Sequence, residues 1–200
     1  MPKIPILLLA AGASSRMGSS KALLSWNKEP LIVSRIHNLL ATGQKVYVVL
    51  GAYADIVIPT IKNLDVTICT NNNWKEGMST SIAFAVKSIQ SKEDLLDGIL
   101  IATIDQPLVD TQHLTAILTC YKEGQQQIIV SESSNGWRGV PALFDAHYLD
   151  ALCSLKGDSG AKKVVYAHSE KVCIVNGGEK LVDMDTPERY KQLLKATHQL

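Results

Sequence analysis

Residues 4–21 read IPILLLAAGASSRMGSSK, an apolar run that leads into a loop of small residues carrying two cations. The run 4–10 contains no polar residue, which is typical of a strand covered on both faces in a parallel sheet. In such sheets ligands bind beyond the carboxyl ends of the strands. This stretch therefore predicts an α/β fold and makes the loop after residue 10 the first candidate for a site.

Short apolar runs and amphipathic stretches continue to alternate along the chain, with no repeat or linker between them. This alternation predicts a Rossmann-like three-layer sandwich, a mostly parallel sheet with helices on both faces, in a single domain over residues 1–200. The expected strands are 4–10, 45–50, 65–69, 98–103, 127–131 and 171–175. The expected helices are 30–42, 53–62 (despite Pro59), 79–88, 111–121 with Thr111 as N-cap, 145–153, 159–168 and one that begins near 186.

Composition narrows the class of partner. The chain has 200 residues and a formal net charge of +1, so nothing indicates nucleic acid or an anionic membrane as a bulk partner. No segment approaches the ~20 apolar residues of a membrane span. The four cysteines are widely spaced, without a C-x-x-C pair, and are typical of thiols in a reducing compartment. We therefore expect a cytoplasmic protein that handles small molecules.

The loop after the first strand is suited to anions. Backbone N–H groups of small residues can surround a phosphate, and Arg16 and Lys21 can neutralise a triphosphate. It is not a P-loop, because five residues separate Gly12 from Gly18 and a serine follows the second glycine. The dinucleotide pattern G-x-G-x-x-G also fails, since Ser14 stands in place of its second glycine. The alternative is a solvated loop without a ligand.

Carboxylates follow two later segments. Asp105 comes just after the expected strand 98–103, where a hard oxygen ligand suits Mg²⁺. The alternative is a turn or capping residue before the helix at 111. Asp183 and Asp185 would share one face of an extended segment, so both could approach the same edge. Capping of the last helix by Asp185 or Thr186 is the alternative, and both interpretations can hold together.

Several segments form a recognisable set. The loop LAAGASSRMGSSK at 9–21 is similar to the signature loop of the MobA-like nucleotidyltransferases, and it most resembles the cytidylyltransferase (MocA-like) branch. The resemblance spans nearly the whole chain and implies a fold of the nucleotide-diphospho-sugar transferase type. Further similar segments are GMSTSI at 77–82, DQP at 105–107, RGVPALF at 138–144, GDSGAK at 157–162 and DMDTPE at 183–188.

The resemblance implies a role for individual residues. Arg16, Lys21 and Asp105 would be catalytic, and Asp105 and Asp185 would hold Mg²⁺. Nucleotide binding is implied for Leu9, Ala10, Ala11, Gly12, Ser14, Ser15, Arg16, Lys21, Gly77, Ser79, Ser81 and Asp105. Acceptor binding is implied for Gln106, Pro107, Arg138, Gly139, Pro141 and Asp158. Two positions depart from the family pattern: Ile104 replaces a glycine, and Val140 replaces a histidine of the cytidylyltransferase branch.

The resemblance also implies a reaction. CMP would pass from CTP to the phosphate of molybdopterin that carries molybdate, with release of pyrophosphate. The start Ala10-Ala11-Gly12 favours cytidine over guanosine on the family pattern. A phosphate nucleophile is already ionised near neutral pH, so no general base is needed. Transient contact with a molybdoenzyme or its chaperone would follow.

Other functions stay open at this point. Relatives with this loop include guanylyltransferases and other small-molecule nucleotidyltransferases, such as the cytidylyltransferase of isoprenoid synthesis. A more distant class oxidises or reduces nicotine-derived pigments, which needs a redox cofactor for which the sequence has no fingerprint. A non-catalytic factor that delivers cofactor to a molybdoenzyme is the remaining alternative, and it would bind nucleotide without releasing pyrophosphate.

Overall fold

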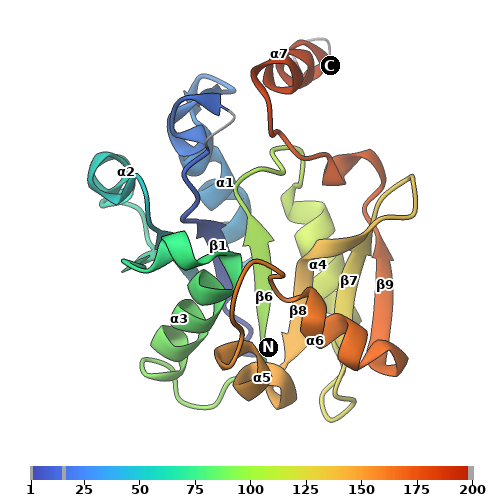
Figure 1. Ribbon diagram of the computed structural model, residues 1–200. Coiled ribbons are helices and arrows are strands. Elements are labelled where there is room, and N and C mark those ends of the chain that lie inside the picture. Colours follow the sequence, from blue (N-terminus) through green and yellow to red (C-terminus); the bar gives the residue numbers. More distant parts are fainter. Residues whose placement is uncertain (1, 15–16, 198–200) are drawn as a thin grey trace.

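The computed structural model describes residues 2–14 and 17–197. Its centre is a seven-stranded sheet in the order β5-β4-β1-β6-β8-β7-β9, with helices on both faces (Figure 1). The strands are β1 Ile6–Ala10, β4 Val46–Leu50, β5 Thr67–Thr70, β6 Gly98–Thr103, β7 Ile128–Glu132, β8 Arg138–Asp145 and β9 Val172–Asn176. The mostly parallel sheet expected from the sequence is confirmed.

One strand runs against the others. β1 pairs in parallel with β4 and β6, and β7 pairs in parallel with β9, whereas β8 is antiparallel to both β6 and β7. The first residues of β8 therefore lie at the edge where the neighbouring strands end. Residues at the start of β8 and at the end of β6 can thus contribute to one site.

Helices cover both faces of the sheet. They are α1 Leu31–Leu40, α2 Ala54–Ile61, α3 Met78–Gln90, α4 Thr111–Cys120, α5 Leu149–Cys153, α6 Lys162–Ala167 and α7 Pro187–Thr197. Short 3₁₀ turns are η2 Lys21–Leu23, η3 Trp74–Glu76, η4 Ala146–Tyr148, η5 Ser169–Lys171 and η6 Gly178–Leu181, and a small hairpin joins β2 Ser25–Trp26 to β3 Glu29–Pro30. Among the described helices, none combines the length and the apolar character that crossing a membrane requires.

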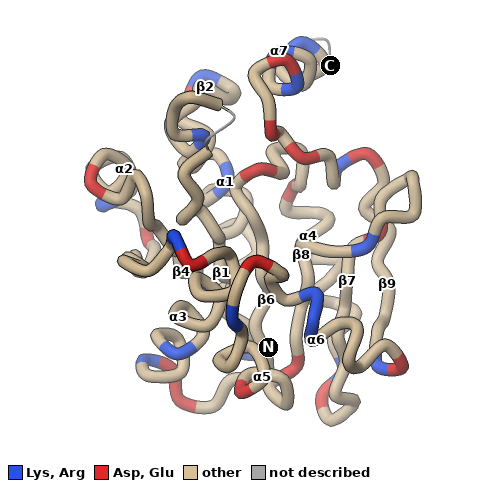
Figure 2. Tube along the Cα trace, viewed as in Figure 1, with Lys and Arg blue, Asp and Glu red and all other residues tan. Residues whose placement is uncertain are grey.

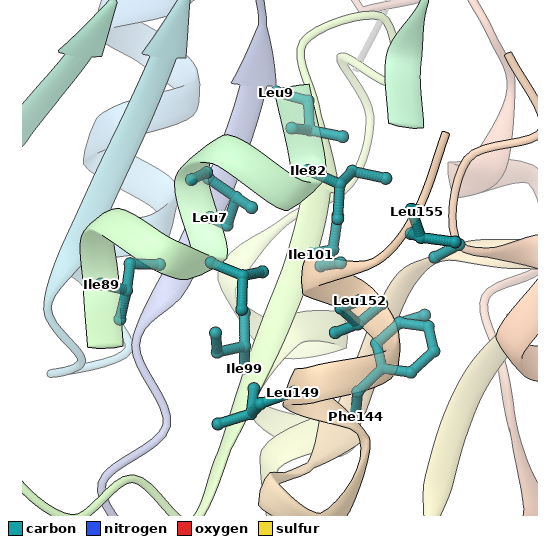
Figure 3. Close-up of a cluster of buried hydrophobic side chains, with 14 of the residues drawn as sticks. Leu7, Leu9, Ile82, Ile89, Ile99, Ile101, Phe144, Leu149, Leu152 and Leu155 are labelled. Atoms are coloured by element: carbon teal, nitrogen blue, oxygen red, sulfur yellow. The ribbon is translucent and has the colours of Figure 1, made fainter. Parts of the chain in front are cut away.

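The first strand shows why its sequence is apolar throughout. Leu7 and Leu9 point into the core under α3, α5 and α6, where Figure 3 shows them beside Ile82 and Ile101. Ile6 and Leu8, which alternate with them, belong to the opposite core under α1, α2 and α4. Each fully buried side chain of this kind contributes about 1.5–3 kcal/mol relative to exposure. Burial on both faces thus places the end of β1 firmly at the sheet edge.

A third apolar cluster joins two distant segments. Trp26 and Leu31, which follow the first loop, pack with Met184 and Leu193 from the end of the chain. The Tyr190 hydroxyl adds a hydrogen bond of 2.7 Å to the Ser25 carbonyl oxygen. Residues soon after Lys21 are thereby held beside the segment that carries Asp183 and Asp185.

The structure differs from the expectations in several elements. β8 was not predicted, because Gly139 and Pro141 are poor strand residues. The pairing register shifts opposite them, between Val130 and Ser131 of β7. At this irregularity the ladder does not require the backbone N–H that proline lacks. The β2–β3 hairpin was also missed. The N-cap of α4 is Asp110 and not Thr111, because the Asp110 carboxylate accepts a hydrogen bond of 2.9 Å from the His113 amide.

Charged side chains of both signs are interspersed along the trace (Figure 2). This distribution agrees with the formal net charge of +1. Recognition of an anionic ligand must therefore depend on a local group of cations.

Candidate active site

Two cavities open at the carboxyl edge of the sheet. The first, which we call the loop cavity, has a volume of about 340 Å³ and lies against the loop after β1 and the start of α3. The second, which we call the sheet cavity, has a volume of about 710 Å³ and lies over β7 and β8 beside α6. Leu9, Met78, Thr103 and Asp105 line both cavities. The two spaces therefore meet at the end of β6.

Most residues predicted to bind nucleotide line the loop cavity. They are Leu9, Ala10, Ala11, Gly12, Ser14, Lys21, Gly77, Ser81 and Asp105. Ser79 does not line it, because its side chain is fully buried and its hydroxyl accepts a hydrogen bond of 3.0 Å from the Gly160 amide. Ser15 and Arg16 lie outside the described residues. The sequence did not single out Trp74 and Lys75, which also line this cavity.

Lys21 places a cation in the wall of the loop cavity. Only 8% of the residue is exposed, and its Nζ lies 2.5 Å from Oδ1 of Asp185. Its backbone N–H is 3.3 Å from the Ser14 hydroxyl oxygen, which ties the residue to the loop that precedes it. Such a buried ammonium group can bind a phosphate oxygen once a triphosphate enters.

Gly77 fixes the contact between α3 and the loop 157–160. Its φ of +107° lies in a region that side-chain-bearing residues rarely adopt, and an added Cβ would lie 2.0 Å from Oδ1 of Asp158. The amide of Ser79 donates a hydrogen bond of 3.0 Å to the Gly157 carbonyl. Asp158, predicted for the acceptor, lines the loop cavity and not the sheet cavity because this contact holds it there.

We expect Gly77→Ala to lower the free energy of unfolding by about 2–3 kcal/mol, from a strained backbone and a displaced Asp158. Denaturant unfolding measures this difference. Gly124→Ala is the matched control, because Gly124 has a φ of +77° with nothing within 4 Å of an added Cβ. It carries the backbone strain alone, so equal losses in both variants would contradict the packing role assigned to Gly77.

Asp105 lies at the junction of the two cavities. Its backbone carbonyl accepts a hydrogen bond of 2.7 Å from the Met184 amide, and the preceding amide, of Ile104, donates to the Leu9 carbonyl at 3.1 Å. The carboxylate atom Oδ1 is buried and has no hydrogen-bond partner within the described part of the chain. A buried carboxylate oxygen without a donor fits a cation.

Three carboxylates influence one another at this edge. Loss of water contact raises the pKa of Asp183, and the negative charges of Asp105 and Asp185 raise it further, while Gln106 and Lys21 oppose the increase. Asp183 lines the sheet cavity, whereas Asp185 lines neither cavity and contacts Lys21. Within residues 2–14 and 17–197, no three His, Cys, Asp or Glu side chains come close enough to hold a metal ion by themselves.

The sheet cavity is mostly apolar, with cations at its mouth. Of the residues predicted for the acceptor, Gln106, Arg138 and Gly139 line it. Pro107 and Pro141 are buried and line neither cavity. Arg138 Nε lies 2.7 Å from Oε1 of Glu132, so this guanidinium is paired at the rim.

Residues that the sequence did not assign complete this wall. Val140 adds an apolar surface where the cytidylyltransferase branch has a histidine. Trp137 packs over Gly139, where a Cβ would lie 2.4 Å from an indole atom. Lys162 Nζ is 6.0 Å from the indole centroid of Trp137. Lys162 lies in a segment that was singled out and Trp137 directly precedes another, but no local pattern shows that β8 and α6 face one cavity.

Known proteins resemble this chain over most of its length. The family model described as the MobA-like NTP transferase domain matches residues 6–172. Nicotine blue oxidoreductase of Paenarthrobacter nicotinovorans is 28% identical over 97% of this chain and 98% of its own length. Molybdenum cofactor cytidylyltransferase of Escherichia coli is 23% identical over 95% of each chain.

Solved structures share the fold. A protein from Mycobacterium tuberculosis superposes with a TM-score of 0.85 at 24% identity, over 97% of this chain and 98% of that chain. The same mycobacterial protein in complex with manganese gives a TM-score of 0.80 at 23% identity, over 97% and 99%. The family match includes Lys21 and Asp105, whereas Asp183 and Asp185 lie beyond its end at residue 172.

Proposed function

The chain belongs to the MobA-like NTP transferase family and is a nucleotidyltransferase, and from this premise we propose that it transfers CMP from CTP to the phosphate of a molybdopterin-type acceptor. Pyrophosphate is the second product. The position of Asp105 between two cavities carries the proposal, because a transfer reaction needs donor and acceptor to meet at one point and Asp105 lines both cavities. The relative named molybdenum cofactor cytidylyltransferase supports the choice of donor and acceptor.

The loop cavity is assigned to the donor. Its wall consists of small residues from the loop after β1, which leave backbone N–H groups accessible to phosphate oxygens. Lys21 supplies a positive charge against the triphosphate, and Arg16 is proposed from the sequence to add a second. These cations stabilise the charge that develops on the departing pyrophosphate.

The sheet cavity is assigned to the acceptor. Its larger volume of about 710 Å³ suits a small organic molecule. An acceptor seated there with its phosphate toward Asp105 would place that phosphate beside the donor. The acceptor phosphate oxygen attacks the α-phosphorus and forms a new P–O–P bond, and the bond from the α-phosphorus to the bridging oxygen of the β-phosphate breaks.

This chemistry depends on positioning and charge. The acceptor phosphate is ionised near neutral pH, so no side chain has to remove a proton from it. Trp137 and the apolar wall around Val140 and Ala142 would hold the acceptor body and exclude water. Exclusion of water limits hydrolysis of the donor.

A divalent metal fits this edge of the sheet. Asp105 offers the buried Oδ1 that lacks a donor, and Asp185 already accepts a cation, the Lys21 ammonium. Mg²⁺ is commonly held by one or two carboxylates together with substrate phosphates, which agrees with the small number of carboxylates here. We propose Asp105 and Asp185 as its ligands; when bound, Mg²⁺ would neutralise phosphate charge.

Pyrophosphate release tests the proposed function. We expect release from CTP with Mg²⁺ only when molybdopterin charged with molybdate is present, and much slower release from GTP, ATP and UTP. Release from GTP alone would replace the proposal with guanylyl transfer. CTP binding without any release, with acceptor present, would favour a non-catalytic maturation factor.

We also propose a cytoplasmic location, which the free cysteines of the described chain support. Contact with a recipient molybdoenzyme would follow the transfer.

A second candidate function is reduction or oxidation of a pigment. The observation in its favour is the 28% identity to nicotine blue oxidoreductase. This function requires electron transfer to or from a nicotinamide or flavin. Nicotinamide oxidation in the presence of nicotine blue, with no pyrophosphate formed from any nucleotide, would favour this candidate over nucleotidyl transfer.

A further inference from the structure

Buried polar atoms without a partner gather at one place. Within the described residues they are Arg35 Nε, Arg35 Nη2, Thr103 Oγ1, Asp105 Oδ1 and Gln106 Oε1. Buried polar groups are nearly always hydrogen-bonded, so each exception needs an explanation. Thr103, Asp105 and Gln106 line the sheet cavity, where a ligand or water can satisfy them. Arg35 lines none of the cavities described above, so its two unpaired nitrogens need another reason.

Arg35 is hydrogen-bonded to the turn that begins at Asp105. The residue lies on α1 with only 1% of its surface exposed, and its Nη1 donates a hydrogen bond to the Val109 carbonyl oxygen. The Val109 amide in turn donates to the Gln106 carbonyl at 3.3 Å, which closes the turn 106–109. The guanidinium therefore anchors, from the α1 side, the segment that places Asp105 at the cavity junction.

The charge of Arg35 is directed at the same segment. Burial lowers the pKa of Arg35 to about 10, and the negative charges of Asp105 and Asp110 oppose that change, so the side chain stays cationic at neutral pH. Asp110 is already engaged, because it caps α4 and lies 2.7 Å from Lys180 Nζ. Asp105 keeps one buried oxygen without a donor. Asp105 is therefore the carboxylate whose negative charge Arg35 can offset.

A purely structural role would not require this charge. A buried cation carries a large desolvation cost, and replacement of a whole buried ion pair by apolar residues of similar volume is often neutral or stabilising. Asp105 is half-buried at the cavities and Asp110 has its own cation, so removal of the guanidinium leaves no carboxylate sealed from water. A costly buried charge beneath a site carboxylate is typical of a residue kept for function.

We propose that Arg35 is a positioning residue, whose guanidinium holds the turn 105–110 against α1 and offsets the charge of Asp105 so that this carboxylate stays at the junction of the two cavities. The proposal rests on the proposed function, because Asp105 is the group that acts on the substrates. Arg35 itself touches neither donor nor acceptor. Its removal should therefore affect turnover and leave donor binding nearly unchanged.

Three variants of the full chain test this role. Arg35→Met removes the charge at similar length, Arg35→Lys keeps it, and Asn38→Leu removes the neutral donor that lies 3.5 Å from the same Val109 oxygen. For Arg35→Met we expect kcat to fall about 10- to 100-fold, the effect typical of a residue that orients a site ligand. The KM for the nucleoside triphosphate should change less than about threefold, and loss of the donor to the Val109 carbonyl should lower the thermal midpoint only modestly.

Rescue and hydrogen exchange complete the test. Arg35→Lys should recover most of kcat, Asn38→Leu should keep it, and backbone amides of 105–110 should exchange faster in Arg35→Met than in the wild type. Unchanged kcat in Arg35→Met, or equal losses in the methionine and lysine variants, would overturn the proposal. If the wild type turns over no nucleotide, the proposed function fails, and hydrogen exchange alone then tests the role of Arg35. Unchanged exchange of the amides of 105–110 in Arg35→Met would overturn that role. Faster exchange of these amides would support it.

Discussion

Asp105→Asn is expected to lower kcat about a thousandfold, which corresponds to about 4 kcal/mol of lost transition-state stabilisation. The substitution keeps the size of the side chain and removes the charge at the point where the two cavities meet. A neutral amide oxygen is a much weaker ligand for a divalent cation and does not balance the charge of the phosphates. Steady-state pyrophosphate release from CTP and acceptor measures the loss.

The matched control is Asp110→Asn, the same change on the same turn. Asp110 lines neither cavity, and asparagine caps a helix about as well as aspartate does. We expect this variant to keep kcat within a few-fold. The Asp105 variant should stay folded with a midpoint near that of the wild type, because relief of the repulsion with Asp183 and loss of the attraction to Arg35 oppose each other. Near-normal turnover by a folded Asp105→Asn protein would refute the catalytic assignment.

Lys21→Met is expected to weaken CTP binding in the presence of Mg²⁺ by about 10- to 100-fold, the range for loss of one charge-assisted hydrogen bond. The Lys21 side chain is 10% exposed and lies in the wall of the loop cavity, so few water molecules compete with a phosphate for its ammonium group. kcat should fall as well, because the same charge faces the departing pyrophosphate. Titration calorimetry with CTP and Mg²⁺, without acceptor, measures the change in CTP affinity by itself.

Lys62→Met serves as the control for Lys21→Met, since Lys62 is an exposed lysine at the end of α2. It should bind CTP as the wild type does. Higher ionic strength should reduce the effect of Lys21 only partly, because a buried charge is screened less than an exposed one. If Lys21→Met bound CTP with unchanged affinity, its phosphate role would have to be abandoned.

The positions of the loop after β1 and of Asp105 in the fold could be predicted from the sequence. The apolar run before Ala10 fixes a strand between two cores, and the small residues after it lie at the sheet edge as expected. Asp105 follows a similar buried strand, so its position at the same edge follows from the parallel arrangement. These predictions worked because they depend on local patterns and on one general rule about strand ends.

The wall of the sheet cavity was harder to predict because it is assembled from distant segments. Trp137 and Lys162 come together only through the pairing of β8 and the position of α6. Ser79 occurs in a segment typical of nucleotide contact, but a close approach to Gly160 buries its hydroxyl. Arg35 reads as one polar residue on an amphipathic helix, and only the packing of α1 against Val109 shows that it is buried.

The reversed direction of β8 separates the linings of the two cavities along the chain. The loops after β1 and β6 line the loop cavity, whereas the start of β8 and α6 line the sheet cavity. On the proposed assignment of the sheet cavity to the acceptor, substitutions in the turn between β7 and β8 are expected to change acceptor choice more than donor binding, because Gly136 and Trp137 line that cavity alone. An exchange of this hairpin between family members would then be a route to new acceptor specificity.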